Sequence, residues 1–304
     1  MLITEVGPRD GLQNEAAPVS SAAKVAFVEA LVRAGVRQIE VTSFVHPSRV
    51  PAMADAEAVY AGVRREPGVR YLALTPNERG YERATAAGCD AVAVFTAASE
   101  DFTRANIGMS IDESLERFRA ISREAQRDGV AVRGYVSTVF ACPFAGPIAP
   151  EAVLRVVEPM LEGGCYEVSL GDTIGIGTPA DVSRLLDLLL TRVPADKLAL
   201  HLHDTWGMAA ANTLRGLDHG IRSFDSSAGG LGGCPYAPGA TGNAATEDLV
   251  HMLHALGHDT GLDVEAVALA ADAIAGSLDH ALVGRAHQAI LARRRRLARA
   301  QGAA

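Results

Sequence analysis

The chain has 304 residues, of which 48% are hydrophobic and 21% are charged, and its formal net charge is −8 at pH 7. This composition excludes a disordered chain, and the negative charge argues against a general binder of nucleic acid or of anionic membrane surfaces, because such binders need a basic field. We therefore expect a globular protein with a large core, and neither nucleic acid nor a membrane as its partner.

Targeting segments and disulfide patterns are not recognisable in the sequence. No apolar run reaches the roughly 18 residues of a membrane span, and the N-terminus lacks the basic segment and long apolar stretch of a secretory signal. The four cysteines are widely spaced, without a zinc-like or redox pairing, at Cys89, Cys142, Cys165 and Cys234. These features predict a cytoplasmic protein with free thiols.

Eight short runs rich in β-branched and apolar residues recur along the chain, and they are separated by stretches of helical periodicity. The predicted strands are residues 2–6, 38–43, 69–74, 91–95, 131–138, 166–170, 197–202 and 223–226. The predicted helices between them include residues 22–34, 112–128, 150–162 and 179–191. Eight alternating units predict a parallel sheet that closes into a (β/α)8 barrel, the TIM barrel of the α/β class.

We expect the barrel to be one domain, residues 1–275, followed by additional C-terminal helices, residues 276–304, that pack on it. The basic run at residues 293–299 in this last segment is interpreted as a solvated helix. A doubly wound open sheet is the competing topology. It is disfavoured because the sequence GPRDG at residues 7–11, after the first strand, is not a glycine-rich phosphate loop.

Polar residues at the ends of the predicted strands are the first candidates for a site, because barrel enzymes place their chemistry at the carboxyl ends of the strands. Candidates for catalysis are Arg9, Asp10, Glu40, Asp172 and His201. Candidates for contacts with a substrate are Arg9, Gln13, Ser43, Asn77, Ser137 and Thr173.

The strongest local signal is the pair His201 and His203 in the seventh strand. Residues i and i+2 of a strand point to the same side, so both imidazoles can face the mouth of the barrel. Asp10 can add a carboxylate oxygen, and Asn243, after the eighth strand, an amide oxygen. Two nitrogens and two oxygens, with open positions for water, suit Mg²⁺ or Mn²⁺ better than a closed tetrahedral zinc site.

Two further features each allow two interpretations. Arg9 either forms an ion pair with Asp10 that seals the top of the barrel or neutralises an oxyanion that develops during a reaction. Cys234 lies in a glycine-rich loop, residues 226–243, of the kind that often forms an active-site lid. The thiol is either an inert loop cysteine or a candidate acid or nucleophile.

Together these segments resemble the hydroxymethylglutaryl-CoA lyase family from about residue 5 to about residue 256. The similar segments are EVGPRDGLQNE (5–15), TSFV (42–45), GYVS (134–137), CYEVSLGDTIG (165–175), HLHDT (201–205) and GGLGGCPYA (229–237). The glycine–cysteine segment is the most specific of them. The N-terminal segment 5–15, which contains Arg-Asp-Gly, is also found in related Claisen-type synthases.

The resemblance implies a (β/α)8 barrel with a divalent metal ion held by Asp10, His201, His203 and Asn243. It also implies that Arg9 stabilises an enolate-like carbonyl, that Glu40 and Asp172 support the site, that Cys234 takes part in proton transfer and that His201 is catalytic. The implied reaction cleaves 3-hydroxy-3-methylglutaryl-CoA to acetoacetate and acetyl-CoA, a step of leucine degradation and ketone-body formation. Coenzyme A enters as part of the substrate, and the expected assembly is a homodimer.

Three alternatives remain open at this point. The chain could be a lyase for a longer, similar CoA ester, or a condensing acyl-CoA synthase that uses a 2-oxo acid. Such synthases usually carry extra C-terminal domains, whereas only residues 276–304 follow the predicted barrel, which favours a lyase. A barrel that binds metal without catalysis, acting as an interaction protein, is the alternative from another class. The residues whose joint presence argues against it are Arg9, Asp10, His201, His203, Cys234 and Asn243.

Overall fold

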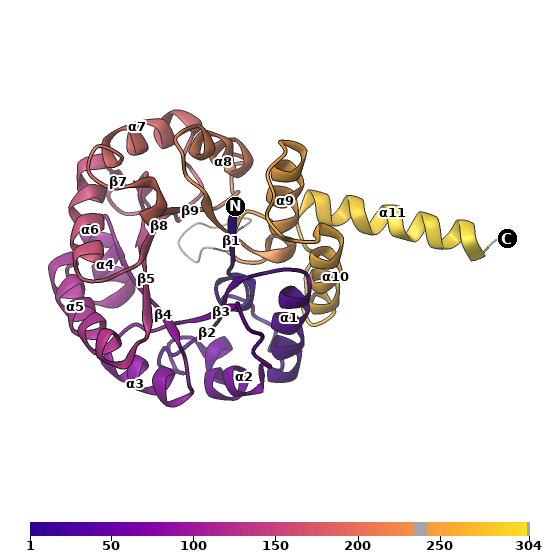
Figure 1. The fold of residues 1–304 in the computed structure, drawn as a ribbon, viewed down its shortest axis with the longest axis horizontal. Helices are drawn as coiled ribbons and strands as arrows, with labels where there is room; N and C mark the ends of the chain where they lie inside the picture. Colours follow the sequence, from indigo (N-terminus) through magenta and orange to yellow (C-terminus); the bar gives the residue numbers. More distant parts are fainter. Residues whose placement is uncertain (234–241, 303–304) are drawn as a thin grey trace.

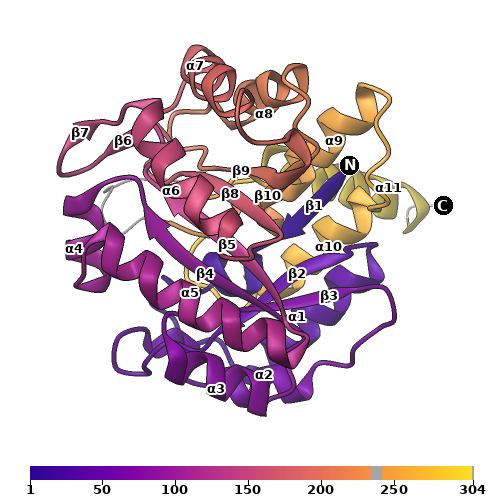
Figure 2. The same cartoon turned by 60° about the vertical axis from the view of Figure 1, so that its left-hand side comes forward.

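The computed structural model describes residues 1–233 and 242–302, and it has eight parallel strands that close into a barrel (Figures 1 and 2). Around the barrel the strands follow the order β1-β10-β9-β8-β5-β4-β3-β2. Their bounds are Leu2–Glu5 (β1), Gln38–Ser43 (β2), Arg70–Leu74 (β3), Ala91–Ala97 (β4), Ala131–Ser137 (β5), Glu167–Asp172 (β8), Leu198–Leu202 (β9) and Ser223–Ser226 (β10). All eight predicted strands are confirmed, with ends that differ by at most two residues.

Helices surround the barrel, as Figure 1 shows in a view along it. They are Ser21–Arg33 (α1), Ala56–Gly62 (α2), Glu78–Ala86 (α3), Glu100–Ile107 (α4), Ile111–Asp128 (α5), Pro150–Glu162 (α6), Pro179–Leu189 (α7), Ala209–Asp218 (α8), Thr246–Ala255 (α9), Val264–Ala275 (α10) and Arg285–Gly302 (α11). A short hairpin of Ala141–Cys142 (β6) and Gly146–Pro147 (β7) follows β5. Among the described residues, no helix is both long and apolar enough to cross a membrane.

Local sequence explains where the predicted helices begin and end. Ser110 and Glu113 form a reciprocal capping box at the start of α5, and this helix ends at Gly129, whose φ of 72° favours glycine. Thr178 and Asp181 form the same box at the start of α7, where Pro179 occupies the first turn. Each cap satisfies backbone N–H groups that a helix start leaves without partners.

The core lies mainly between the strands and the helices. Phe27, Leu31 and Ile39 belong to one apolar cluster that follows this layer around the barrel. Inside the barrel a separate, smaller apolar cluster contains Leu72, Leu74, Ala91, Ala93 and Tyr135. Charged side chains are also buried, among them Arg9, Arg133 and Asp225, and they lie at or near the site described below.

The C-terminal segment packs on the barrel through its first part. Helix α11 contacts α9 and α10 near its start and then projects away from the barrel (Figure 1). The arginines of the basic run are exposed, and Arg293 and Arg294 pair with Glu265 of α10. This agrees with the prediction of a solvated helix, while the division into domains at residue 275 stays a prediction.

Candidate active site

Three side chains with metal-binding atoms converge at the mouth of the barrel. Asp10 lies in a short helical turn, Gly7–Gly11, after β1, whereas His201 lies in β9 and His203 directly follows this strand. One donor atom from each of the three lies within 4.8 Å of the other two. The Nε2 atoms of the two histidines are 3.2 Å apart, and Nε2 of His201 is 3.8 Å from Oδ2 of Asp10. The predicted grouping of these residues is therefore observed.

The electrostatics of this cluster suit a cation. Burial alone would raise the pKa of Asp10, but the charges of Arg9, His201 and His203 and the hydrogen bond from Asn243 lower it to about 2. Burial, followed by the effect of His201, lowers the pKa of His203 to about 4, so this imidazole is neutral at pH 7. Two buried imidazoles with facing nitrogens beside an ionised carboxylate are a donor set that a divalent ion would complete.

Asn243, the last residue of the glycine-rich loop, lies at the same cluster. It forms a β-bridge with His203, and its Nδ2 donates hydrogen bonds to Oδ2 of Asp10 at 2.9 Å and to the carbonyl of Leu231 at 3.1 Å. Because the amide nitrogen faces two acceptors, Asn243 orients the carboxylate of Asp10. Its predicted role as a metal ligand stays a prediction.

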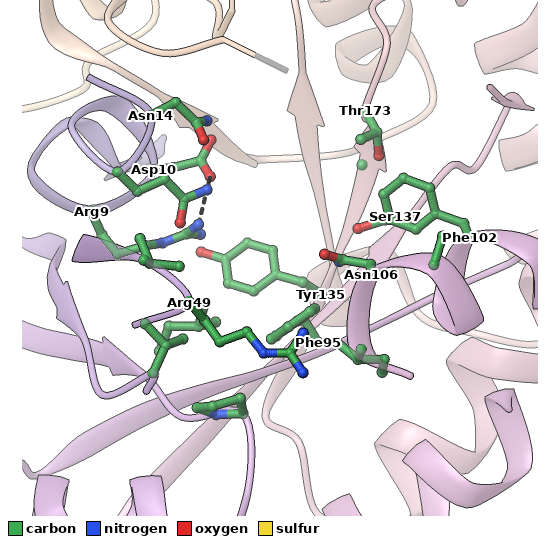
Figure 3. Close-up of a pocket in the computed structure, with 18 of the residues that line it drawn as sticks. Arg9, Asp10, Asn14, Arg49, Phe95, Phe102, Asn106, Tyr135, Ser137 and Thr173 are labelled. Atoms are coloured by element: carbon green, nitrogen blue, oxygen red, sulfur yellow. Dashed lines mark hydrogen bonds and ion pairs between the residues drawn. The ribbon is translucent and has the colours of Figure 1, made fainter. Parts of the chain in front are cut away.

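Arg9 lies beside the cluster with its guanidinium almost wholly buried. It donates from Nε to Oε2 of Glu40 at 2.6 Å and from a terminal nitrogen to Oδ1 of Asp10 at 2.5 Å, and its carbon Cζ lies 5.8 Å from the ring centre of Tyr135. Figure 3 shows Arg9 between Asp10 and Tyr135. The ion pair of the first interpretation is present. Arg9 also lines the cavity, so it can contact a substrate at the same time.

Glu40 lies beneath Arg9 and does not line the cavity. Burial raises the pKa of this carboxyl, and the ion pair with Arg9 opposes the shift. Its second oxygen, Oε1, has no hydrogen-bond partner among the described residues. Glu40 thus holds Arg9 in place from below.

A cavity of about 660 Å³ opens in front of the cluster, a volume typical of small-molecule sites. Several of the predicted substrate contacts line it, namely Arg9, Gln13, Asn77, Ser137 and Thr173. Gln13 also donates to Oδ1 of Asp10 at 3.1 Å. These predicted residues are therefore brought together around one cavity, although which of them touch a substrate stays a prediction.

Ser43 and Asp172, two other predicted site residues, do not line the cavity. The hydroxyl of Ser43 is directed at the carbonyl of Leu74 on the neighbouring strand. Asp172 accepts the backbone N–H groups of Ile176 and Gly177 and so shapes the loop after β8; burial raises its pKa to about 6. Cys234 lies outside the described residues.

The cavity also contains residues that the sequence analysis missed. Tyr135 lies on β5 two positions before Ser137, so the two-residue period of the strand could have identified it. Arg49, Phe102 and Asn106 come from a loop and from α4, and Figure 3 shows them around the same cavity. No local motif marks these three positions.

Comparisons with known proteins find similar chains over almost the whole length of this one. The family model described as HMGL-like matches residues 1–274. A hydroxymethylglutaryl-CoA lyase of Pseudomonas mevalonii is 53% identical over 96% of this chain and 97% of its own length. The human mitochondrial hydroxymethylglutaryl-CoA lyase is 49% identical over 94% of this chain and 88% of its own length.

Solved structures show the same similarity. The crystal structure of hydroxymethylglutaryl-CoA lyase from Pseudomonas aeruginosa superimposes with a TM-score of 0.94 at 49% identity, over 96% of this chain and 97% of that one. An HMG-CoA lyase from Acinetobacter baumannii, solved in complex with coenzyme A and 3-methylmalate, has a TM-score of 0.91 at 35% identity, over 95% and 94% of the two chains.

Proposed function

Because this chain belongs to the HMGL-like family, we propose that it is a lyase that cleaves 3-hydroxy-3-methylglutaryl-CoA to acetoacetate and acetyl-CoA. The observation that carries the proposal is the convergence of Asp10, His201 and His203 at the inner end of a cavity that Arg9 also lines. Carbon–carbon cleavage next to a tertiary alcohol needs a group that accepts the hydroxyl proton and a cation that stabilises the resulting enolate. Both are available here.

A divalent cation, Mg²⁺ or Mn²⁺, is part of the proposal. Asp10, His201 and His203 would hold it, and Asn243 is the further candidate ligand. Such an ion would lower the pKa of the substrate hydroxyl and stabilise the alkoxide. Among the described residues the donors are nitrogen and oxygen atoms, with open positions at the cavity, and such a set favours these ions over structural zinc.

The chain's own groups would carry the remaining steps. Asp10 or His201 would accept the proton of the tertiary hydroxyl. A His201 that carries a proton on Nδ1 and binds the cation through Nε2 has no free lone pair, so in that arrangement Asp10 is the acceptor. As the alkoxide becomes the ketone of acetoacetate, the bond to the thioester α-carbon breaks and its electron pair forms the enolate of acetyl-CoA. The guanidinium of Arg9 would stabilise the enolate oxygen, and a proton, for which the Cys234 thiol is the proposed donor, would return to the α-carbon.

The composition of the cavity supports an acyl-CoA as the substrate. Arg49 and Arg117 line the cavity together with His46, and Asp10 is the single carboxylate among the described residues that line it. A chain of net charge −8 therefore presents a locally basic opening, which suits the phosphate groups of coenzyme A. The relative from Acinetobacter baumannii was solved with coenzyme A, which supports the same assignment. A homodimeric assembly and a cytoplasmic location stay predictions.

Release of acetyl-CoA and acetoacetate from a panel of 3-hydroxyacyl-CoA esters tests the proposed reaction. We expect the 3-hydroxy-3-methylglutaryl ester to give equal amounts of both products in the presence of Mg²⁺ or Mn²⁺. A higher kcat/KM for a longer ester would move the assignment to another lyase. Condensation of acetyl-CoA with a 2-oxo acid, without cleavage of any ester, would contradict it.

A further inference from the structure

Asp225 lies in the middle of β10, directly beside the proposed metal centre but outside the cavity. Its side chain is wholly buried, and in the register of the barrel it is paired with His201 of β9. Its Oδ2 lies 3.2 Å from Nδ1 of His201 and accepts a hydrogen bond from the hydroxyl of Ser169 at 2.8 Å. A buried carboxylate thus lies on the side of His201 that faces away from Asp10 and His203.

Arg133 of β5 holds this carboxylate from the opposite side of the barrel. It is fully buried, and its two terminal nitrogens donate to the two oxygens of Asp225 at 2.7 and 3.1 Å. Its Nε donates to Glu167 at 2.6 Å, and a terminal nitrogen donates to the hydroxyl of Tyr135 at 2.8 Å. A bidentate ion pair that is itself anchored at the arginine leaves the carboxylate little freedom to turn.

The two histidines of the cluster differ in the hydrogen-bond partners of their Nδ1 atoms. Nδ1 of His201 faces the fixed carboxylate of Asp225, whereas Nδ1 of His203 is buried and has no hydrogen-bond partner among the described residues. A carboxylate can only accept a hydrogen bond, so it selects the form of His201 that carries a proton on Nδ1. The lone pair of Nε2 then points to the mouth of the barrel, where Asp10 and His203 lie.

We propose that Asp225 is a positioning residue that fixes the orientation and the tautomer of His201 for binding of the divalent cation. This inference rests on the metal centre of the proposed function. Partners of this kind, which bond the second nitrogen of a metal-binding histidine, contribute a factor of about 10 to 100 in metal affinity. Arg133 has the associated task of neutralising and holding Asp225, since an unpaired carboxylate at this depth would be costly.

Binding of Mn²⁺ alone to the complete, metal-free chain tests this role, with free Mn²⁺ measured by electron paramagnetic resonance. The Asp225→Asn variant is expected to raise the Kd for Mn²⁺ by at least about tenfold. Glu167→Gln is the matched control, because it removes the other ion-pair partner of Arg133 and leaves the pair of Asp225 and His201 intact. For this control we expect a Kd within about twofold of the unmodified chain.

The outcomes separate the inference from the proposal on which it rests. An unmodified chain that binds no Mn²⁺ overturns the metal centre, and the inference with it. An unmodified chain that binds Mn²⁺, with the same Kd in Asp225→Asn, overturns the inference alone. Equal weakening in Glu167→Gln also overturns it, because the network would then act only by supporting the fold.

A second measurement uses the unmodified chain, so it does not depend on whether a variant of Asp225 folds. Long-range proton–nitrogen correlation spectra of the unmodified chain with ¹⁵N-labelled histidine report which ring nitrogen of His201 carries the proton, and a His201→Gln variant identifies its signals. We expect the proton on Nδ1 and none on Nε2. A proton on Nε2 would overturn the inference.

Discussion

The two layers of the barrel are stabilised in different ways. Between strands and helices one apolar cluster surrounds the barrel, and side chains such as Leu31 and Leu186 are wholly buried in it. Inside the barrel an apolar cluster contains Leu72 and Tyr135, and beside it lie buried ion pairs, those of Arg133 with Asp225 and of Arg9 with Asp10. The outer layer supplies most of the stability of the fold, and the inner layer positions the chemistry.

Loss of Arg9 is the largest expected effect on the inner layer. The variant Arg9→Met removes the cation that the proposed mechanism places at the enolate oxygen, so kcat should fall by about a thousandfold. The same variant should still bind Mn²⁺, because Asp10, His201 and His203 remain. Steady-state kinetics together with Mn²⁺ binding measure the two effects. Turnover close to that of the unmodified chain would contradict the proposed role.

A cavity in the outer layer should lower the stability of the fold and leave kcat almost unchanged. Leu186→Ala truncates a wholly buried side chain of α7 and should lower the free energy of unfolding by about 2 to 5 kcal/mol. Its kcat at 25 °C should stay within about twofold, because the side chain lies outside the barrel strands. Urea unfolding measures the first quantity. As a control, Leu214→Ala of α8, where the side chain is 43% exposed, should change stability by less than about 0.5 kcal/mol. A large fall in kcat for Leu186→Ala would mean that the two layers are not separate.

Glu5 is a buried carboxyl group without a paired cation among the described residues, and it tests how much unfolding free energy such a group costs when it ionises. This carboxylate accepts hydrogen bonds from Gly7, Ala228 and Thr246, and within residues 1–233 and 242–302 it has no ion-pair partner. Burial raises its pKa from 4.5 to about 7.

The folded state therefore keeps a proton that the unfolded state loses between pH 4.5 and about 7, so this group lowers stability as the pH rises through that interval. Relative to Glu5→Gln, which cannot ionise, the unmodified chain should lose up to about 3 kcal/mol of unfolding free energy between pH 4.5 and pH 8. Urea unfolding of both proteins across this range checks the difference. Parallel pH profiles would show that Glu5 does not titrate in this way.

Substitution of Arg49 should have the smallest effect, because this residue is exposed at the opening of the cavity. Arg49→Gln should raise the KM for the acyl-CoA about five- to tenfold, the loss of one solvent-exposed phosphate contact, and leave kcat within about twofold. The matched control is Arg37→Gln, an exposed arginine that does not line the cavity and directly precedes β2. An equal increase of KM in both variants would indicate a general charge effect.

The sequence alone predicted the outer layer well, because helix and strand periods report directly which side chains face a core. It also placed Asp10, His201 and His203 together, since strand ends meet at one rim of a barrel. The inner network was not predictable, because Arg133 and Asp225 lie 92 positions apart and nothing local links them. The direction of a single hydroxyl, such as that of Ser43, depends on a neighbouring strand in the same way.

The measurement that tests the central claim most directly is a metal titration of the chain after treatment with EDTA. Acetyl-CoA release from 3-hydroxy-3-methylglutaryl-CoA should be absent from the metal-free chain. It should rise in proportion to added Mn²⁺ and saturate at one ion per chain, in keeping with the cluster of Asp10, His201 and His203, which among the described residues is the one group of potential metal ligands that lines the cavity. Full activity of the metal-free chain would contradict the account.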